Sequence, residues 1–175
     1  MSSREVDILL VEDNKDDLEL ALHALRRERL ANRIQIARDG EEALDFLFCR
    51  GEFTDRAMDR QPRLVLLDLK LPKVDGLDVL KQIKEDARTK TIPVVILTSS
   101  KEERDLVISY KLGVNSYIQK PVDFEKFRDT VRQVGLYWLV VNQAPVPDAA
   151  LKVSGAVDLC GPEPVEAGSA RRHRT

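Results

Sequence analysis

Side chains that could do chemistry follow short apolar runs in this sequence. Glu12 and Asp13 follow the first run, Asp68 follows the third, and Thr98 and Lys120 follow the last two. The carboxyl ends of parallel strands meet at one edge of an open sheet, where ligands bind in the crevice outside it. Carboxylates crowded at that edge would raise one another's pKa unless a cation neutralised them. The spacing therefore predicts a cation site.

The expected ligands are all oxygen atoms, with no His or Cys among them. Oxygen ligands favour Mg²⁺, which takes one or two carboxylates and keeps several waters. We expect Asp13 and Asp68 to bind the ion directly and Glu12 to act through water. The backbone carbonyl of Lys70 would complete the protein ligands, and Mn²⁺ could substitute for Mg²⁺.

With the cation in place, Asp68 could act as a nucleophile toward phosphorus, because carboxylates form acyl-phosphate intermediates. Lys120 would neutralise charge on the transferring group, and the Thr98 hydroxyl would hydrogen-bond a phosphate oxygen. This chemistry makes Asp68, Lys120 and Thr98 the candidate catalytic residues.

Five apolar runs alternate with helical patterns and must position these groups. The runs cover residues 6–11, 34–37, 64–67, 94–97 and 116–118. Several are apolar on both faces, which is typical of parallel strands covered by helices on both sides. Apolar residues at helical spacing lie between the strands and after the last one, for example Leu18, Ala21, Leu22 and Leu25. The pattern predicts an open, doubly wound α/β domain.

Two segments break this alternation. Residues 50–63 mix Gly, Thr and Pro with charges, and we expect an enlarged loop there between the second helix and the third strand. After residue 142 the composition changes to Pro, Ala, Gly and Val with scattered charges. We therefore expect one domain over residues 1–142 and a disordered tail over residues 143–175.

Composition narrows the classes of partner. The 175 residues carry a formal charge of -2 with 33% charged residues, so no broad basic field favours nucleic acid. Cys49 and Cys160 have no metal-site or disulfide spacing. The sequence shows neither a signal peptide nor an apolar run long enough for a bilayer. These features predict a cytoplasmic protein without membrane or nucleic-acid contacts.

Four segments resemble the receiver-domain motifs of response regulators. They are Leu-Val-Glu-Asp-Asn, Leu-Leu-Asp-Leu-Lys-Leu-Pro-Lys-Val-Asp-Gly, Leu-Thr-Ser-Ser and Tyr-Ile-Gln-Lys-Pro, within about residues 5–142. The resemblance implies a flavodoxin-like, five-stranded parallel sheet of order 2-1-3-4-5. It also implies that a histidine kinase phosphorylates Asp68 and that the Lys120-Pro121 bond is cis. Tyr117 would change rotamer as Thr98 moves to the phosphate. Such a protein catalyses only its own phosphorylation and dephosphorylation.

The enlarged loop and the ending Gly-Leu-Tyr-Trp-Leu-Val-Val-Asn resemble phytochrome-associated response regulators, which implies a phytochrome-type kinase. Residues 136–141 are apolar all round, more than one buried helix face can absorb, and such a surface usually marks an interface. We expect a homodimer through the fourth helix, fifth strand and fifth helix. Alternatively, the enlarged loop or the tail folds over these residues.

Three other functions fit these residues less well. A haloacid-dehalogenase-like phosphatase needs a second Asp two residues after its nucleophile, where this chain has Lys70. An FMN carrier needs a Ser/Thr/Gly-rich phosphate loop after the first strand, where this chain has Glu-Asp-Asn-Lys-Asp-Asp. The remaining alternative is a receiver-fold interaction module that signals without phosphorylation. The full set of strand-end residues argues against it.

Overall fold

The structure is a computed structural model that describes residues 6–27, 33–121 and 123–143. Its parallel strands pair in the order β2-β1-β3-β4-β5, which confirms the predicted topology. The strands are β1 (Ile8–Val11), β2 (Ile34–Ala37), β3 (Leu64–Leu67), β4 (Val94–Thr98) and β5 (Ser116–Gln119). Each overlaps one of the five apolar runs.

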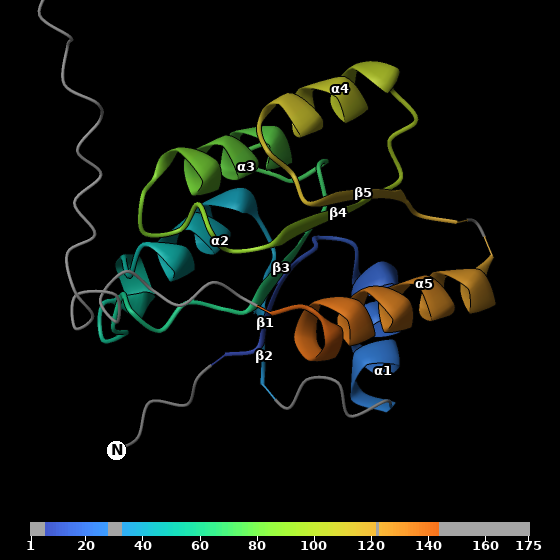
Figure 1. Cartoon of the computed structure of the whole chain (residues 1–175), viewed down its shortest axis with the longest axis horizontal. Helices are drawn as coiled ribbons and strands as arrows, with labels where there is room; N and C mark the ends of the chain where they lie inside the picture. The colour runs from blue at the N-terminus through green and yellow to red at the C-terminus, as the bar shows by residue number, and fades with distance from the viewer. Residues whose placement is uncertain (1–5, 28–32, 122, 144–175) are drawn as a thin grey trace, which may run out of the picture. The chain divides into compact units, whose positions relative to one another are not determined.

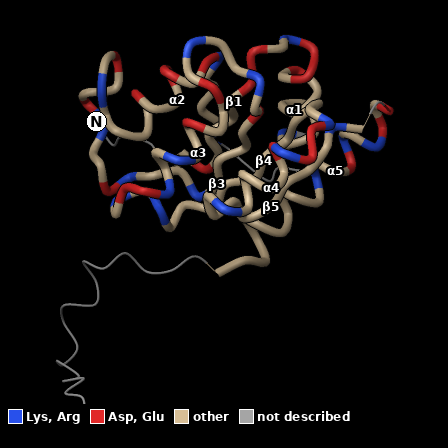
Figure 2. Tube along the Cα trace, turned by 90° about the horizontal axis from the view of Figure 1, so that it is seen from above, with Lys and Arg blue, Asp and Glu red and all other residues tan. Residues whose placement is uncertain are grey.

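Helices cover both faces of this sheet (Figure 1). They are α1 (Lys15–Arg27), α2 (Gly40–Leu47), α3 (Gly76–Glu85), α4 (Glu103–Lys111) and α5 (Phe124–Leu136). In Figure 1, α1 and α5 lie on one side of the sheet, and α2, α3 and α4 on the other. None of these described helices combines the length and apolar character needed to cross a bilayer. Figure 2 shows acidic and basic residues interleaved along the described trace.

The strands are buried on both faces because alternate residues enter two separate cores. Leu9 and Leu67 belong to the core that α2 and α3 cover. Leu10 and Leu66 belong to the core that α1 and α5 cover. Continuous apolar runs are the expected sequence of such strands. The sheet is thereby fixed between two apolar layers, with its carboxyl ends left for polar groups.

Polar side chains set where the helices begin. The Asn14 side-chain oxygen accepts hydrogen bonds from the backbone N–H groups of Asp16 and Asp17, at 2.9 and 3.1 Å. Asn14 is therefore the cap of α1, and Asp16 lies inside the first turn. Asp39 and Asp123 cap α2 and α5 in the same way. The cap of α1 places the first helical turn directly after the acidic end of β1.

The loop between β3 and α3 packs tightly on itself. The Asp75 side chain caps α3 by accepting a hydrogen bond from Leu77 N at 2.9 Å. A Cβ added at Gly76 would lie 2.3 Å from the backbone oxygen of Asp68 and 2.6 Å from Leu69 Cα. No side chain fits there, so glycine is required for the close approach that holds Asp68 in place.

The segment 50–63 lies between α2 and β3 as predicted. It contains a short 3-10 helix, Gly51–Phe53, which the sequence did not predict. The Arg56 guanidinium lies 3.5 Å from the centre of the Phe46 ring and donates to the backbone oxygens of Phe46 and Arg60. The segment is therefore held to α2 by a cation-π contact and hydrogen bonds.

After α5 the chain continues as a π-helix, Tyr137–Val141. Leu139 is buried here, whereas the apolar residues Leu136, Tyr137, Val140 and Val141 are exposed. Arg63, at the end of the enlarged loop, donates from Nη2 to the Leu139 carbonyl at 2.6 Å. Within the described residues the loop thus reaches this backbone but leaves an apolar surface exposed. The predicted tail lies outside the described residues apart from residue 143.

Candidate functional site

Three of the predicted carboxylates meet where β1 and β3 end. Glu12, Asp13 and Asp68 each offer an oxygen, and these oxygens lie within 4.8 Å of one another. Glu12 and Asp68 are buried, whereas Asp13 is exposed. Three carboxylate oxygens at this separation fit a hard divalent cation such as Mg²⁺.

The two oxygens of Asp68 have different partners. Oδ1 accepts hydrogen bonds from the backbone N–H groups of Leu69 and Lys70, at 2.6 and 3.3 Å. Oδ2 accepts one from Lys120 Nζ at 2.8 Å. The backbone fixes the carboxylate through Oδ1, so Oδ2 becomes available to a new bond once the Lys120 ammonium moves.

The Lys120 ammonium has three carboxylate partners. Nζ lies 2.7 Å from Glu12 Oε2 and 2.8 Å from both Asp17 Oδ2 and Asp68 Oδ2. The side chain is only 7% exposed. Burial alone would lower the pKa of Lys120, but the charge of Asp68 and the hydrogen bonds to the three carboxylates hold that pKa above its ordinary value. Lys120 is therefore a fixed positive charge at this site.

The same cluster carries more negative than positive charge. Burial, reinforced by the charge of Asp68, raises the pKa of Glu12 to about 7, although Lys120 opposes the shift. One ammonium cannot neutralise Glu12, Asp13, Asp17 and Asp68 together. The electrostatics thus favour either a proton on Glu12 or a divalent cation.

The two predicted switch residues lie on neighbouring strands. Thr98 is fully buried at the end of β4, and its hydroxyl oxygen accepts a hydrogen bond from Ser100 N at 3.2 Å. On β5, the Tyr117 hydroxyl is buried without a hydrogen-bond partner among the described residues. The coupling of these residues stays a prediction.

Lys70 contributes to the site through its backbone. Its N–H contacts Asp68, as described above, and its carbonyl as a metal ligand stays a prediction. The half-exposed side chain reaches the start of α4, where Nζ lies 3.7 Å from Asp105 Oδ2 and 3.8 Å from Glu102 Oε1. Lys70 thus connects the loop after β3 to α4.

The expectation of a cis bond before Pro121 is wrong, because no peptide bond among the described residues is cis. Trans is the lower-energy isomer. In this form Lys120 N donates to the Thr98 carbonyl at 2.7 Å while Lys120 Nζ reaches its carboxylates. The trans bond therefore suffices to bring the ammonium into the site.

Sequence reasoning missed Asp17. An acidic residue in the first turn of a helix is usually explained by the helix dipole, which hid its contact with a lysine 103 residues away. Asp17 also borders a groove of about 290 Å³ beside the site. The groove is lined by Asp17, Leu20, Ser99, Lys120, Pro121, Phe124 and Phe127. Because Ser99 is exposed there, the groove gives a path toward Lys120.

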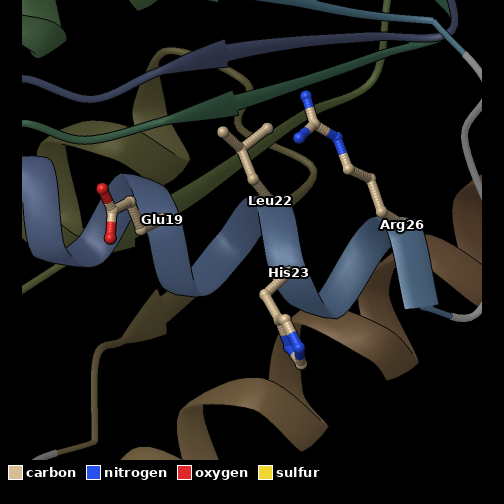
Figure 3. Close-up of a pocket in the computed structure, with 4 residues that line it drawn as sticks. All are labelled: Glu19, Leu22, His23 and Arg26. Carbon is tan, nitrogen blue, oxygen red and sulfur yellow. The ribbon is translucent and has the colours of Figure 1, made fainter.

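A larger hollow, of about 430 Å³, lies along α1 (Figure 3). Glu19, Leu22, His23 and Arg26 line it. Figure 3 shows Leu22 and Arg26 pointing to one side of the helix and His23 to the other, toward α5. These side chains do not converge on one point, and His23 is exposed. The hollow therefore supplies no second set of reactive groups.

Comparison with known proteins identifies the family. Residues 8–132 match the response regulator receiver domain. The chain belongs to this family. Receiver proteins act in two-component signalling and bind Mg²⁺ at an acidic pocket, which corresponds to the cluster of Glu12, Asp13 and Asp68 in this receiver.

Several relatives cover most of this receiver. The probable methanogenesis regulatory protein FilR2 of Methanothrix harundinacea is 47% identical over 80% of this chain and 88% of its own. Response regulator Rcp1 of Synechocystis is 41% identical, over 79% of this chain and 92% of Rcp1. A structure of Rcp1 with bound Mn²⁺ has a TM-score of 0.75 at 39% identity, covering 81% of this chain and 99% of Rcp1.

The phosphorylated cyanobacterial phytochrome response regulator RcpA also has a TM-score of 0.75, at 39% identity over 82% of this chain and all of RcpA. This receiver is therefore related to phytochrome response regulators, as its enlarged loop and C-terminal motif predicted.

Proposed function

We propose that this receiver accepts a phosphoryl group on Asp68 in a Mg²⁺-dependent reaction. The contact of 2.8 Å between Asp68 Oδ2 and the Lys120 ammonium, where Asp68 clusters with the carboxylates of Glu12 and Asp13, supports the proposal most strongly. Glu12, Asp13 and Asp68 would hold Mg²⁺ together with the Lys70 carbonyl. The cation would neutralise charge on the transferring group.

The Asp68 side chain is oriented for such a transfer. Two backbone amides hold Oδ1, so a lone pair of Oδ2 forms the new bond to phosphorus. The bond from phosphorus to the donor breaks, and the donor atom keeps that electron pair. Lys120 moves from Oδ2 to a phosphoryl oxygen, and the Thr98 hydroxyl donates to another. Charge neutralisation thus comes from groups already at the strand ends.

The donor would be a histidine kinase in the cytoplasm, of the phytochrome type. The relation to RcpA and Rcp1 supports this choice. A purified phytochrome kinase that passes its phosphoryl group to Asp68 within minutes, and not to Asp68→Asn, is the expected result. Transfer no faster than that from a small phosphodonor would contradict the phytochrome link.

The output would be a homodimer through α4, β5 and α5. Exposed apolar residues on α4 support it, namely Leu106, Val107 and Tyr110. The exposed surface of Leu136, Tyr137, Val140 and Val141 adds to them. Sedimentation should show dimers at tens of micromolar, and a monomer with and without phosphate would contradict this assignment.

Intact-mass measurement after incubation with acetyl phosphate and Mg²⁺ tests the phosphoacceptor. The parent should gain one phosphoryl group, and Asp68→Asn should gain none. Asp78→Asn is the matched control, because this exposed carboxylate of α3 undergoes the same change and should leave the mass gain intact. Phosphorylation of Asp68→Asn would refute the assignment. No gain in the parent would favour the alternative, an interaction module that signals without phosphorylation.

A further inference from the structure

Asp17 contacts the reactive lysine without belonging to the metal cluster. Its Oδ2 lies 2.8 Å from Lys120 Nζ. The cluster of possible metal ligands among the described residues contains Glu12, Asp13 and Asp68 only. Asp17 is 33% exposed, compared with 5% for the Glu12 side chain on the same ammonium. Its direct contact with the site is therefore the one with Lys120.

The three N–H groups of the Lys120 ammonium match its three carboxylate partners. A transferring phosphoryl group can receive one of them only if a carboxylate releases it. Asp68 releases its contact when Oδ2 bonds to phosphorus, but before that step the ammonium covers Oδ2 at 2.8 Å. Asp17 stabilises this resting arrangement. Its negative charge also repels the anionic phosphodonor.

We propose that Asp17 is a positioning residue that holds the Lys120 ammonium in its resting place and thereby slows phosphoryl transfer to Asp68. The inference rests on the proposed function. In the step concerned, an Oδ2 lone pair forms the bond to phosphorus of acetyl phosphate. The bond from phosphorus to the acetate oxygen breaks, and acetate leaves with that electron pair. Lys120 moves to a phosphoryl oxygen without transferring its proton.

Removing the charge of Asp17 weakens the resting arrangement but leaves Glu12 and Asp68 to keep Lys120 nearby. The variant Asp17→Asn has nearly the same shape, and its neutral amide is a weaker acceptor for an ammonium than a carboxylate. We expect its initial rate of phosphorylation by acetyl phosphate, at saturating Mg²⁺, to rise about threefold to tenfold. Its Mg²⁺ affinity should equal that of the parent within about twofold, because Asp17 is not a ligand.

Asp16→Asn is the matched control. Asp16 lies in the same helical turn, is exposed, and has its N–H bonded to Asn14 like that of Asp17, but it is not one of the three partners of Lys120. The Asp16→Asn substitution therefore removes one negative charge from the same end of α1 as Asp17→Asn does. Asp17→Glu keeps the carboxylate and should retain the parental rate. The melting temperatures of all variants would reveal a purely structural effect. If Asp17→Asn has a lowered melting temperature, Asp17→Ser provides a second neutral variant.

The outcomes distinguish the role of Asp17 from the proposed phosphorylation of Asp68. Faster phosphorylation of Asp17→Asn than of Asp16→Asn, with rescue by Asp17→Glu, supports the inference. Equal rates in the two Asn variants, or slower phosphorylation of Asp17→Asn and Asp17→Ser, overturn it while the proposed function stands. A parent that gains no phosphoryl group overturns both.

Discussion

Mg²⁺ binding to this receiver should weaken as the pH falls from about 8 to about 6. Burial raises the pKa of Glu12 to about 7, and the cation favours the ionised carboxylate. The ionised fraction of Glu12 in the metal-free protein is then about 0.9 at pH 8, about 0.5 at pH 7 and about 0.1 at pH 6. The dissociation constant for Mg²⁺ should therefore rise about tenfold across this range.

Calorimetric titration with Mg²⁺ measures this dependence directly. Near pH 7, binding should release about half a proton, which titrations in buffers of different ionisation enthalpy reveal. Glu12→Gln is the control, because its amide can still accept a hydrogen bond from a metal-bound water but cannot titrate. Its affinity should be lower and nearly independent of pH. A Mg²⁺ affinity of the parent that stays constant between pH 6 and 8 would refute the reasoning. So would a Mg²⁺ affinity of Glu12→Gln that depends on pH as strongly as that of the parent.

The same carboxylate affects stability when a chelator removes Mg²⁺. The pKa of Glu12 is higher in the folded protein than its ordinary value of 4.5, so the folded state retains a proton that the unfolded state has lost. Relative to Glu12→Gln, the parent should therefore lose stability as the pH rises from about 4.5 to about 7. The loss should be on the order of 2 kcal/mol in the free energy of unfolding by urea.

Three further predictions concern Lys84, Gly76 and Lys70. Burial lowers the pKa of Lys84 to about 8, so the parent should gain stability relative to Lys84→Met between about pH 8 and pH 10.5, as urea unfolding can measure. Gly76→Ala should lower the free energy of unfolding by about 3 kcal/mol, because its Cβ would collide with the Asp68 carbonyl; unchanged stability would contradict this packing. Lys70→Asn should change the half-life of the phosphorylated protein, because Lys70 links the loop after β3 to α4; an unchanged half-life after loading with acetyl phosphate would dismiss that role.

Local patterns in the sequence predicted the five strands and their main helices. The apolar runs are continuous because each strand is buried on both faces, and this burial is readable from neighbouring residues alone. The reactive residues could be predicted for a related reason. Parallel strands bring their carboxyl ends to one edge, so the residues after each run indicate which side chains meet.

Other features depend on backbone geometry that periodicity does not specify. The apolar ending after residue 136 predicted an exposed surface, but not the π-helix of Tyr137–Val141 or the Arg63 hydrogen bond to its backbone. The resemblance to the family implied a cis bond before Pro121, and the structure has a trans bond. The two isomers of a bond before proline differ by only about 1 kcal/mol, so residue types alone do not select one.

The sequence by itself determined which groups stand at the strand ends, because the order of the chain and the burial of each run dictate it. Only the tertiary structure decided which of those groups share a partner. Lys120 lies 52 residues from Asp68 and 108 residues from Glu12 in the chain, yet its ammonium contacts both. Packing of α1 against the sheet adds Asp17 to the same ammonium. Contacts over such separations follow from the folded positions of whole elements, and no local pattern encodes them.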